Sequence, residues 1–263
     1  KKLYLPNLFC IGDYDKDMWQ KFGVDIKNFH PVGNLRLANF YYHIRSEKNL
    51  EEKYKSDICL VAGNFVYSSK KNEKQTLLDQ SFIESGLEQG LVKLVKYTVR
   101  FCIKNNMKLI IPLKKDKKYR YDSHKNEIKY FEKNFDKEEF NYIKNSFLER
   151  DRDNFSSYRA LINSEVAVSV TSTMLRHKLA MEGKILACNL TNIDRYDFAI
   201  NGICTLNNCT YEEFEERLLE IHSIDKENYF SKMDKDPNYL EKITKNYSTI
   251  NLIRKKLYNL GLK

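Results

Sequence analysis

Residues 158–189 read Y-R-A-L-I-N-S-E-V-A-V-S-V-T-S-T-M-L-R-H-K-L-A-M-E-G-K-I-L-A-C-N, and this stretch decides the fold. At its centre, residues 166–170 form an apolar, β-branched run of strand length. A hydroxyl-rich turn follows at 171–173, and residues 174–182 are good helix formers. Residues 184–188 form a second apolar run. The stretch therefore predicts a buried strand, a helix and a second buried strand that pairs with the first in parallel.

The turn before this helix has the composition of an anion site. A hydroxyl group of Ser172 or Thr173 is suited to cap the helix. The first N–H groups of the helix then point out of the carboxyl end of a parallel sheet, where open α/β folds bind ligands and where anions are favoured. Arg176 adds a positive charge one turn into the helix. We expect these three residues to hold a phosphate-bearing ligand; the alternative is an ordinary βαβ unit with a polar cap.

Strand-like and helical segments alternate between residues 58 and 222. Further strands are predicted at 58–62 and 109–113, with a short one at 202–206, and further helices at 87–105, 137–149, 156–164 and 239–260. Thr210 and Glu213 have the spacing of a capping box, which predicts another helix starting there. This alternation predicts an α/β fold with a Rossmann-like, doubly wound parallel sheet.

Three loops at the carboxyl ends of the predicted strands are expected to face one another. Glycine after the first strand lets backbone approach a ligand closely, although a Gly-Asn pair is also common in ordinary turns. Lysines after the second strand supply positive charge, and the hydroxyl-rich turn supplies donors. The predicted phosphate-binding residues are Gly63, Asn64, Lys114, Lys115, Ser172, Thr173 and Arg176.

The motif resembles the nucleotide-sugar-binding half of GT-B glycosyltransferases, especially those that build bacterial surface polysaccharides. In that family a strand ends in a Ser-Thr or Ser-Ser pair, a helix follows, and a G-K-x-[VIL]-L strand comes next. Residues 172–173 and 183–186 match this pattern. The chain departs from many relatives at 176–178, where Arg-His-Lys replaces an early ribose-binding Glu, and after residue 113, where no His-Pro pair follows.

The resemblance implies a domain order. Residues 1–45, which include the V-G-N-L-R segment at 32–36, correspond to the end of an N-terminal, acceptor-side domain or its remnant. Residues 46–225 correspond to the Rossmann-like GT-B C-terminal domain, and residues 226–263 to a C-terminal helical tail. Asp13 is predicted to cap a helix that runs to Phe22. Because the first residue is Lys1 rather than Met, we expect a chain that is processed, trimmed or part of a longer product with an upstream portion.

The resemblance also implies transfer of a sugar from a nucleotide-sugar donor to a glycan or lipid-linked acceptor. CMP- and UDP-sugars are the favoured donors, and no further cofactor is expected. No Asp-x-Asp pair occurs in the motif region, which predicts a reaction independent of metal. His177 and Asp13 are candidates for the catalytic base, and Glu182 is a third by residue type alone; a lone helical His is also typical of a structural role.

Composition limits the other classes of protein. The 263 residues are 42% hydrophobic and 13% aromatic, as in folded proteins. The six scattered cysteines form no C-x-x-C pair, which predicts buried thiols in a reducing compartment. No apolar run reaches membrane-spanning length and no signal peptide is visible, which predicts a cytoplasmic protein, at most peripheral at the inner membrane face. Walker, G-x-G-x-x-G, G-x-S-x-G and H-E-x-x-H motifs are absent from the sequence.

The net charge of +9 is concentrated in residues 104–133, which hold ten Lys or Arg and four Asp or Glu. This segment is interpreted as a solvated basic loop, or as a contact with a phosphorylated ligand or an anionic membrane. Its tyrosines, Tyr119, Tyr121 and Tyr130, are able to stack on bases, but no nucleic-acid-binding module surrounds them. The alternatives to a glycosyltransferase are a non-catalytic nucleotide- or glycan-binding domain of a larger enzyme, and a basic RNA-binding protein.

Overall fold

The structure is a computed structural model that describes residues 3–44, 52–62, 86–115, 117–118, 121–150, 155–242 and 249–261. The chain divides into two compact units. The first comprises residues 1–50, 179–182 and 235–263, and the second comprises residues 51–178 and 183–234. The domain assignment made from the sequence, with boundaries after residues 45 and 225, stays a prediction.

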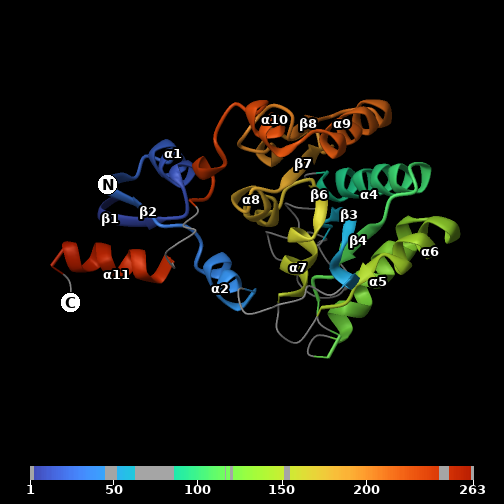
Figure 1. Ribbon diagram of the computed structural model, residues 1–263, viewed down its shortest axis with the longest axis horizontal. Helices are drawn as coiled ribbons and strands as arrows, with labels where there is room; N and C mark the ends of the chain where they lie inside the picture. Colours follow the sequence, from blue (N-terminus) through green and yellow to red (C-terminus); the bar gives the residue numbers. More distant parts are fainter. Residues whose placement is uncertain are drawn as a thin grey trace. The chain divides into compact units, whose positions relative to one another are not determined.

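A six-stranded parallel sheet forms the centre of the second unit (Figure 1). Its strands lie in the order β5-β4-β3-β6-β7-β8. From β3 the chain adds β4 and then β5 on one side. It then returns to the other side of β3 with β6, and adds β7 and β8 beyond it. The predicted α/β class with a doubly wound parallel sheet is therefore confirmed. The strands are β3 (Ser56–Leu60), β4 (Leu109–Pro112), β5 (Phe147–Leu148), β6 (Ser164–Ser169), β7 (Lys184–Asn189) and β8 (Thr205–Asn207).

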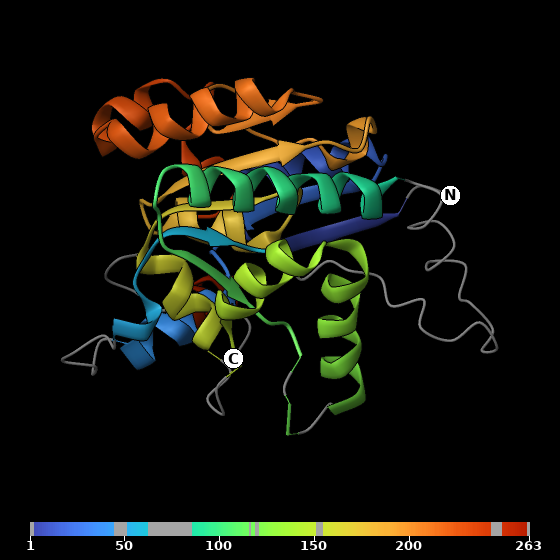
Figure 2. The ribbon, with the colours of Figure 1, turned by 90° about the vertical axis from the view of Figure 1, so that its right-hand side faces the viewer.

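Helices cover both faces of this sheet. In Figure 1, α7 and α8 lie over one face, and α4 and α6 lie over the other; Figure 2 views the sheet from the side that α4 covers. The helices of this unit are α4 (Leu87–Lys104), α5 (Tyr121–Asn134), α6 (Lys137–Asn145), α7 (Ser156–Ile162), α8 (Thr173–Ala180), α9 (Tyr211–Ser223) and α10 (Lys226–Ser231), with short 3-10 turns η1 (Glu52–Tyr54) and η2 (Asp194–Tyr196).

The predicted elements with a strong local signal are confirmed, whereas the basic segment was misjudged. The predicted helix at 87–105 is α4, and the capping box of Thr210 and Glu213 starts α9. β3 and β6 each begin two residues before the predicted apolar run, because Ser56 pairs with Ser164 in the sheet. Residues 121–134, interpreted as part of a solvated loop, form α5, and Phe131 is fully buried there.

The first unit contains a two-stranded parallel sheet of β1 (Tyr4–Cys10) and β2 (Asp25–Pro31). Helix α1 (Asp13–Lys21) connects the two strands, and α2 (Leu35–Ile44), η3 (Pro237–Tyr239) and α11 (Thr249–Asn259) complete the unit. The predicted capping role of Asp13 is wrong. Gly12 occupies the N-cap position without a side-chain hydrogen bond, and the carboxylate of Asp15 instead accepts from the Ile11 N–H at 2.7 Å.

Two buried lysines of the second unit bind the carboxyl ends of helices. The Lys178 ammonium donates to the carbonyls of Leu161 and Ser164 at 2.5 and 2.6 Å, at the end of α7. The Lys184 ammonium donates to the carbonyls of His222 and Ile224, both at 3.0 Å, at the end of α9. Positive charge is favoured at these helix ends, and the orphan carbonyls gain donors.

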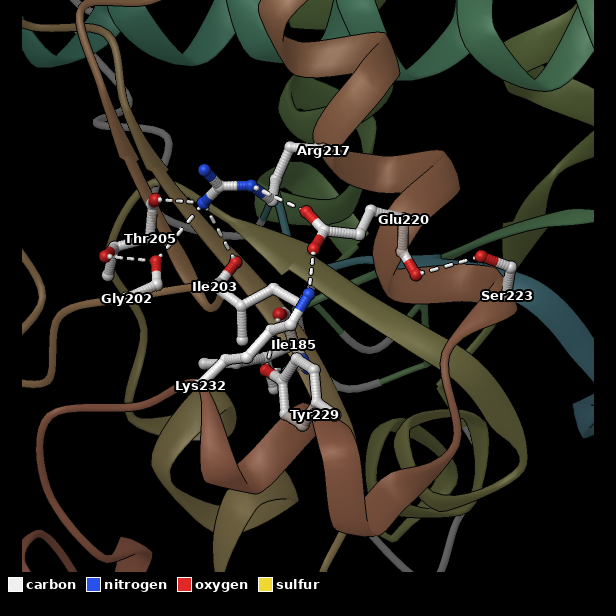
Figure 3. A network of polar contacts seen from close by, with 9 residues as sticks. All are labelled: Ile185, Gly202, Ile203, Thr205, Arg217, Glu220, Ser223, Tyr229 and Lys232. Carbon is white, nitrogen blue, oxygen red and sulfur yellow. Dashed lines mark hydrogen bonds and ion pairs between the residues drawn. The ribbon is translucent and has the colours of Figure 1, made fainter.

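An arginine-centred network holds the last strand (Figure 3). Arg217 on α9 donates to the carbonyls of Gly202, Ile203 and Thr205 at 3.1–3.2 Å. Glu220 lies between Arg217, at 3.4 Å, and Lys232, at 2.6 Å. Since β8 is only three residues long, these side-chain contacts fix the edge of the sheet.

All six cysteines are buried thiols, as predicted. None of the helices in the described ranges is both long enough and apolar enough to cross a membrane. Across the same ranges, His, Cys, Asp and Glu side chains form no group of three or more suited to a metal ion.

The buried thiols predict loss of stability in alkali. Burial disfavours the thiolate and raises the pKa of Cys59, Cys102 and Cys204 to about 12, and that of Cys10 to about 11. A group with a raised folded-state pKa contributes stability below its unfolded pKa and loses it as the pH rises towards the folded value. The free energy of unfolding is therefore expected to fall between about pH 9 and pH 11.

Two lysines oppose this effect, because burial lowers the pKa of Lys178 to about 8 and also lowers the pKa of Lys184. The four thiols outnumber these two groups. Urea titrations of the unmodified protein and of Cys59→Ala at several pH values measure the effect. The variant is expected to have the shallower pH dependence. A free energy of unfolding that stays constant up to pH 11 contradicts the prediction.

Gly183 is predicted to be intolerant of a side chain. A Cβ atom at this position would lie 2.5 Å from Cδ of Lys178. Gly183→Ala is expected to cost about 1–3 kcal/mol of stability, as overpacking typically does. In a Lys178→Ala background the obstructing side chain is gone, so the same substitution is expected to cost clearly less. Denaturant titrations of the four proteins in this cycle provide the measurement, and strictly additive losses contradict it.

Candidate functional site

The sheet order reverses between β3 and β6, so the carboxyl ends of these two strands form the topological switch point of the sheet. Helices that leave adjacent strands there go to opposite faces of the sheet, and open α/β folds bind ligands at such a point. The two strand ends are joined by the hydroxyl of Ser169, which donates to the Val61 carbonyl at 2.7 Å. The Val61 N–H in turn donates to the Val168 carbonyl at 2.8 Å. The ends of the two strands are therefore held together by contacts across the switch point.

The hydroxyl-rich turn leads from β6 into α8 at this switch point. The Ser172 hydroxyl accepts from the Met174 N–H at 3.2 Å, and the Ser172 carbonyl accepts from the Leu175 N–H at 3.1 Å. Ser172 is thus the N-cap, which confirms the predicted cap. Thr173 is the first helical residue and is exposed, and Arg176 is partly exposed in the first turn. The phosphate-binding role of these residues stays a prediction.

The loop after β4 is organised by a carboxylate from α5. The N–H groups of Lys114 and Lys115 donate to the two carboxylate oxygens of Glu127, each at 3.0 Å. Glu127 is only 1% exposed, and burial raises its pKa, although these N–H donors and His124 oppose the shift. The backbone donors of this loop are therefore engaged within the protein. The Lys114 side chain is exposed, and that of Lys115 is partly exposed.

The sheet brings two of the three predicted loops to the same edge. β4 and β6 are the two neighbours of β3, so residues 114–115 and 171–173 flank the end of that strand. The third loop, with Gly63 and Asn64, follows β3 directly but lies outside the described residues. The juxtaposition expected from the sequence is thus present for the described part.

The candidate bases lie in separate places. His177 is 5% exposed, and its ring stacks on the buried ring of Tyr158 at a centroid distance of 5.6 Å, a packing typical of a structural histidine. Glu182 lies beyond the C-terminus of α8, opposite the end that Ser172 caps. Asp13 is exposed at the start of α1 in the first unit. A catalytic role for any of them stays a prediction.

Sequence reasoning missed Ser169 and Glu127. Ser169 falls inside an apolar run, and nothing in the run distinguishes its hydroxyl from one that faces solvent. Glu127 carries a weak signal, because residues 124, 127, 131 and 135 recur at helical spacing and all four are buried in the structure. The charge of the surrounding segment concealed that periodicity.

Comparisons with known proteins found a matching family model and similar solved structures. A family model described as "putative O-antigen biosynthesis protein" matches residues 30–213. A structure of sucrose-phosphate synthase from Thermosynechococcus elongatus is similar with a TM-score of 0.44 and 11% sequence identity. The similarity covers 97% of this chain and 58% of the synthase chain. This chain therefore spans little more than half of the length of the synthase. The comparison with curated proteins found no match.

Ser172→Ala tests the cap. Loss of the hydroxyl removes the acceptor of the Met174 N–H, so the substitution is expected to cost about 1 kcal/mol of stability. Thr173→Ala removes a neighbouring hydroxyl that is exposed and is expected to cost less. Thermal and denaturant unfolding of both variants give the comparison. An equal loss in both, or none in Ser172→Ala, contradicts the assignment of Ser172 as the N-cap.

Proposed function

The chain belongs to this O-antigen biosynthesis family, and we propose that it is a glycosyltransferase that moves a sugar from a nucleotide-sugar donor to a surface-glycan or lipid-linked acceptor. The observation that carries the proposal is the switch point between β3 and β6, where Ser172 caps the N-terminus of α8. This is the place in an open α/β sheet where a nucleotide phosphate is best accommodated.

The proposed chemistry is stabilisation of the leaving nucleotide. As the glycosidic bond breaks, negative charge grows on the phosphate that leaves. In this proposal the N-terminus of α8 and the guanidinium of Arg176 stabilise that charge, and the Lys114 and Lys115 side chains add positive charge near the end of the neighbouring strand β4. CMP- and UDP-sugars are the proposed donors, on family resemblance, and the proposed reaction needs no metal ion.

We propose that the first unit belongs to the acceptor side. Its β1–α1–β2 arrangement is a parallel βαβ unit, yet in the two strands only Cys10 is fully buried. Parallel strands are normally covered on both faces, so this arrangement suits the margin of a larger α/β domain. Such a domain is the proposed source of the catalytic base, and Asp13 is the candidate from this unit.

The basic segment supports a second part of the proposal, peripheral contact with an anionic membrane on the cytoplasmic side. Lys125, Lys129 and Lys133 are all exposed on α5. Their spacing of four residues places them along one side of the helix. A row of ammonium groups of this kind is attracted to anionic lipid headgroups, where a lipid-linked acceptor would be presented.

Arg176→Ala tests the donor site. Calorimetry with CMP, UDP, GDP and their sugars is expected to detect binding of at least one nucleotide by the unmodified protein. Loss of a charge-assisted contact with phosphate is expected to weaken that binding by about 1.5–3 kcal/mol. Arg254→Ala, the same change at an exposed position of α11, is the matched control and is expected to leave affinity unchanged.

Other outcomes identify the alternatives. Nucleotide binding without transfer to any glycan or lipid-linked acceptor indicates a non-catalytic domain of a larger enzyme. Salt-dependent binding of mixed RNA, with no binding of nucleotides, indicates a basic RNA-binding protein. Equal affinity of Arg176→Ala and the unmodified protein excludes the proposed phosphate contact.

A further inference from the structure

Two successive backbone N–H groups at the end of β4 converge on one carboxylate. Those of Lys114 and Lys115 point at Oε1 and Oε2 of Glu127, each at 3.0 Å. Successive N–H groups that converge in this way form a concave anion site, of the kind that backbone uses for phosphate. Here a side chain of the same chain fills it, from a buried position in α5.

The same loop is also held through its carbonyl group. Arg150, just beyond β5, donates from Nη1 to the Lys114 carbonyl at 3.0 Å. Next to it, Glu149 accepts from Nε2 of His124, one turn before Glu127 on α5, at 2.9 Å. The backbone that carries the two lysines is therefore fixed from α5 on one side and from the end of β5 on the other.

A carboxylate is the side chain that this position requires. An apolar residue would leave two buried N–H groups without an acceptor, which is costly. Glutamine offers one oxygen, and its amide nitrogen would oppose the second N–H. Burial of a carboxylate costs desolvation free energy. Packing alone does not require a charged side chain at this position.

The internal anion also affects where a ligand phosphate is able to lie. The negative charge and volume of Glu127 occupy the backbone site after β4, so a second anion is repelled from the same N–H groups. The capped N-terminus of α8, after β6, remains for the phosphate. Lys114 and Lys115 are left to approach it through their side chains, from a backbone whose position is fixed.

We propose that Glu127 is a positioning residue: its carboxylate fills the anion site at the end of β4 and holds Lys114 and Lys115 where their side chains meet the phosphate of the ligand at the end of β6. This inference rests on the proposed function, because it takes the carboxyl edge of the sheet as the nucleotide site. It adds a residue that contacts no ligand itself and acts through the two lysines.

The experiment combines amide hydrogen exchange with a double-mutant cycle on the full chain. Glu127→Gln is expected to speed exchange at the amides of residues 114 and 115, and to weaken binding of the preferred nucleotide about tenfold, the size of one charge-assisted contact. In a background that carries Lys114→Ala and Lys115→Ala, the further effect of Glu127→Gln is expected to be less than about twofold, since the groups it positions are gone. Glu132→Gln, the same change at an exposed site on α5, is the control and is expected to alter neither measurement.

Several results overturn the proposal. Equal weakening by Glu127→Gln in both backgrounds shows a general structural effect. Unchanged affinity despite faster amide exchange shows that the loop does not serve the ligand, and tighter binding shows that Glu127 competes with it. If the unmodified protein binds none of CMP, UDP and GDP, the proposed function fails and the ligand-positioning role fails with it. In that case, faster exchange at the amides of residues 114 and 115 in Glu127→Gln still demonstrates the contact between Glu127 and the loop after β4.

Discussion

The pairing of β3 with β6 is the contact on which the rest of the second unit depends. These two strands are far apart in sequence, and every other strand of the sheet is added outward from one or the other. Their pairing forces the chain to wind in two directions and sends the following helices to opposite faces. The switch point at their carboxyl ends is a consequence of this winding. Ser169, whose hydroxyl donates to the Val61 carbonyl, joins the two strand ends there.

Four charged side chains of this unit, of which Lys178, Lys184 and Glu127 are buried, bind backbone groups. Lys178 and Lys184 bind carbonyls at the ends of α7 and α9, Arg217 binds three carbonyls before and within β8, and Glu127 binds two N–H groups after β4. Each charge is stabilised by groups that would otherwise be unpaired in the interior. This changes the interpretation of the Gly183-Lys184 pair. Its residues make room for Lys178 and secure α9, so this half of the motif has a structural role.

The same principle limits the donor site. Of the groups that a phosphate would use, the backbone donors after β4 are already engaged by Glu127, whereas the start of α8 opens on the switch point. Among the residues that the structure describes, the start of α8 is therefore the proposed backbone site for the leaving phosphate, with basic side chains around it. Such a division concentrates charge stabilisation at one position, which favours a defined direction of departure for the nucleotide.

The sequence alone determined those helices and strands whose characteristic residue pattern lies inside the element itself. The helical period of α4, the apolar runs of β6 and β7, and the capping box of α9 each depend on residues a few positions apart, and each element is present. The hydroxyl-rich turn was identified for the same reason, because a cap is a contact over two or three residues. Tertiary structure alone decided the role of Asp13, which Gly12 and Asp15 displace, the helical state of the basic segment, and the partner of Glu127. These outcomes depend on which strands become neighbours and which charges become buried. Both are set by pairing between distant parts of the chain, which residue spacing along the sequence does not encode.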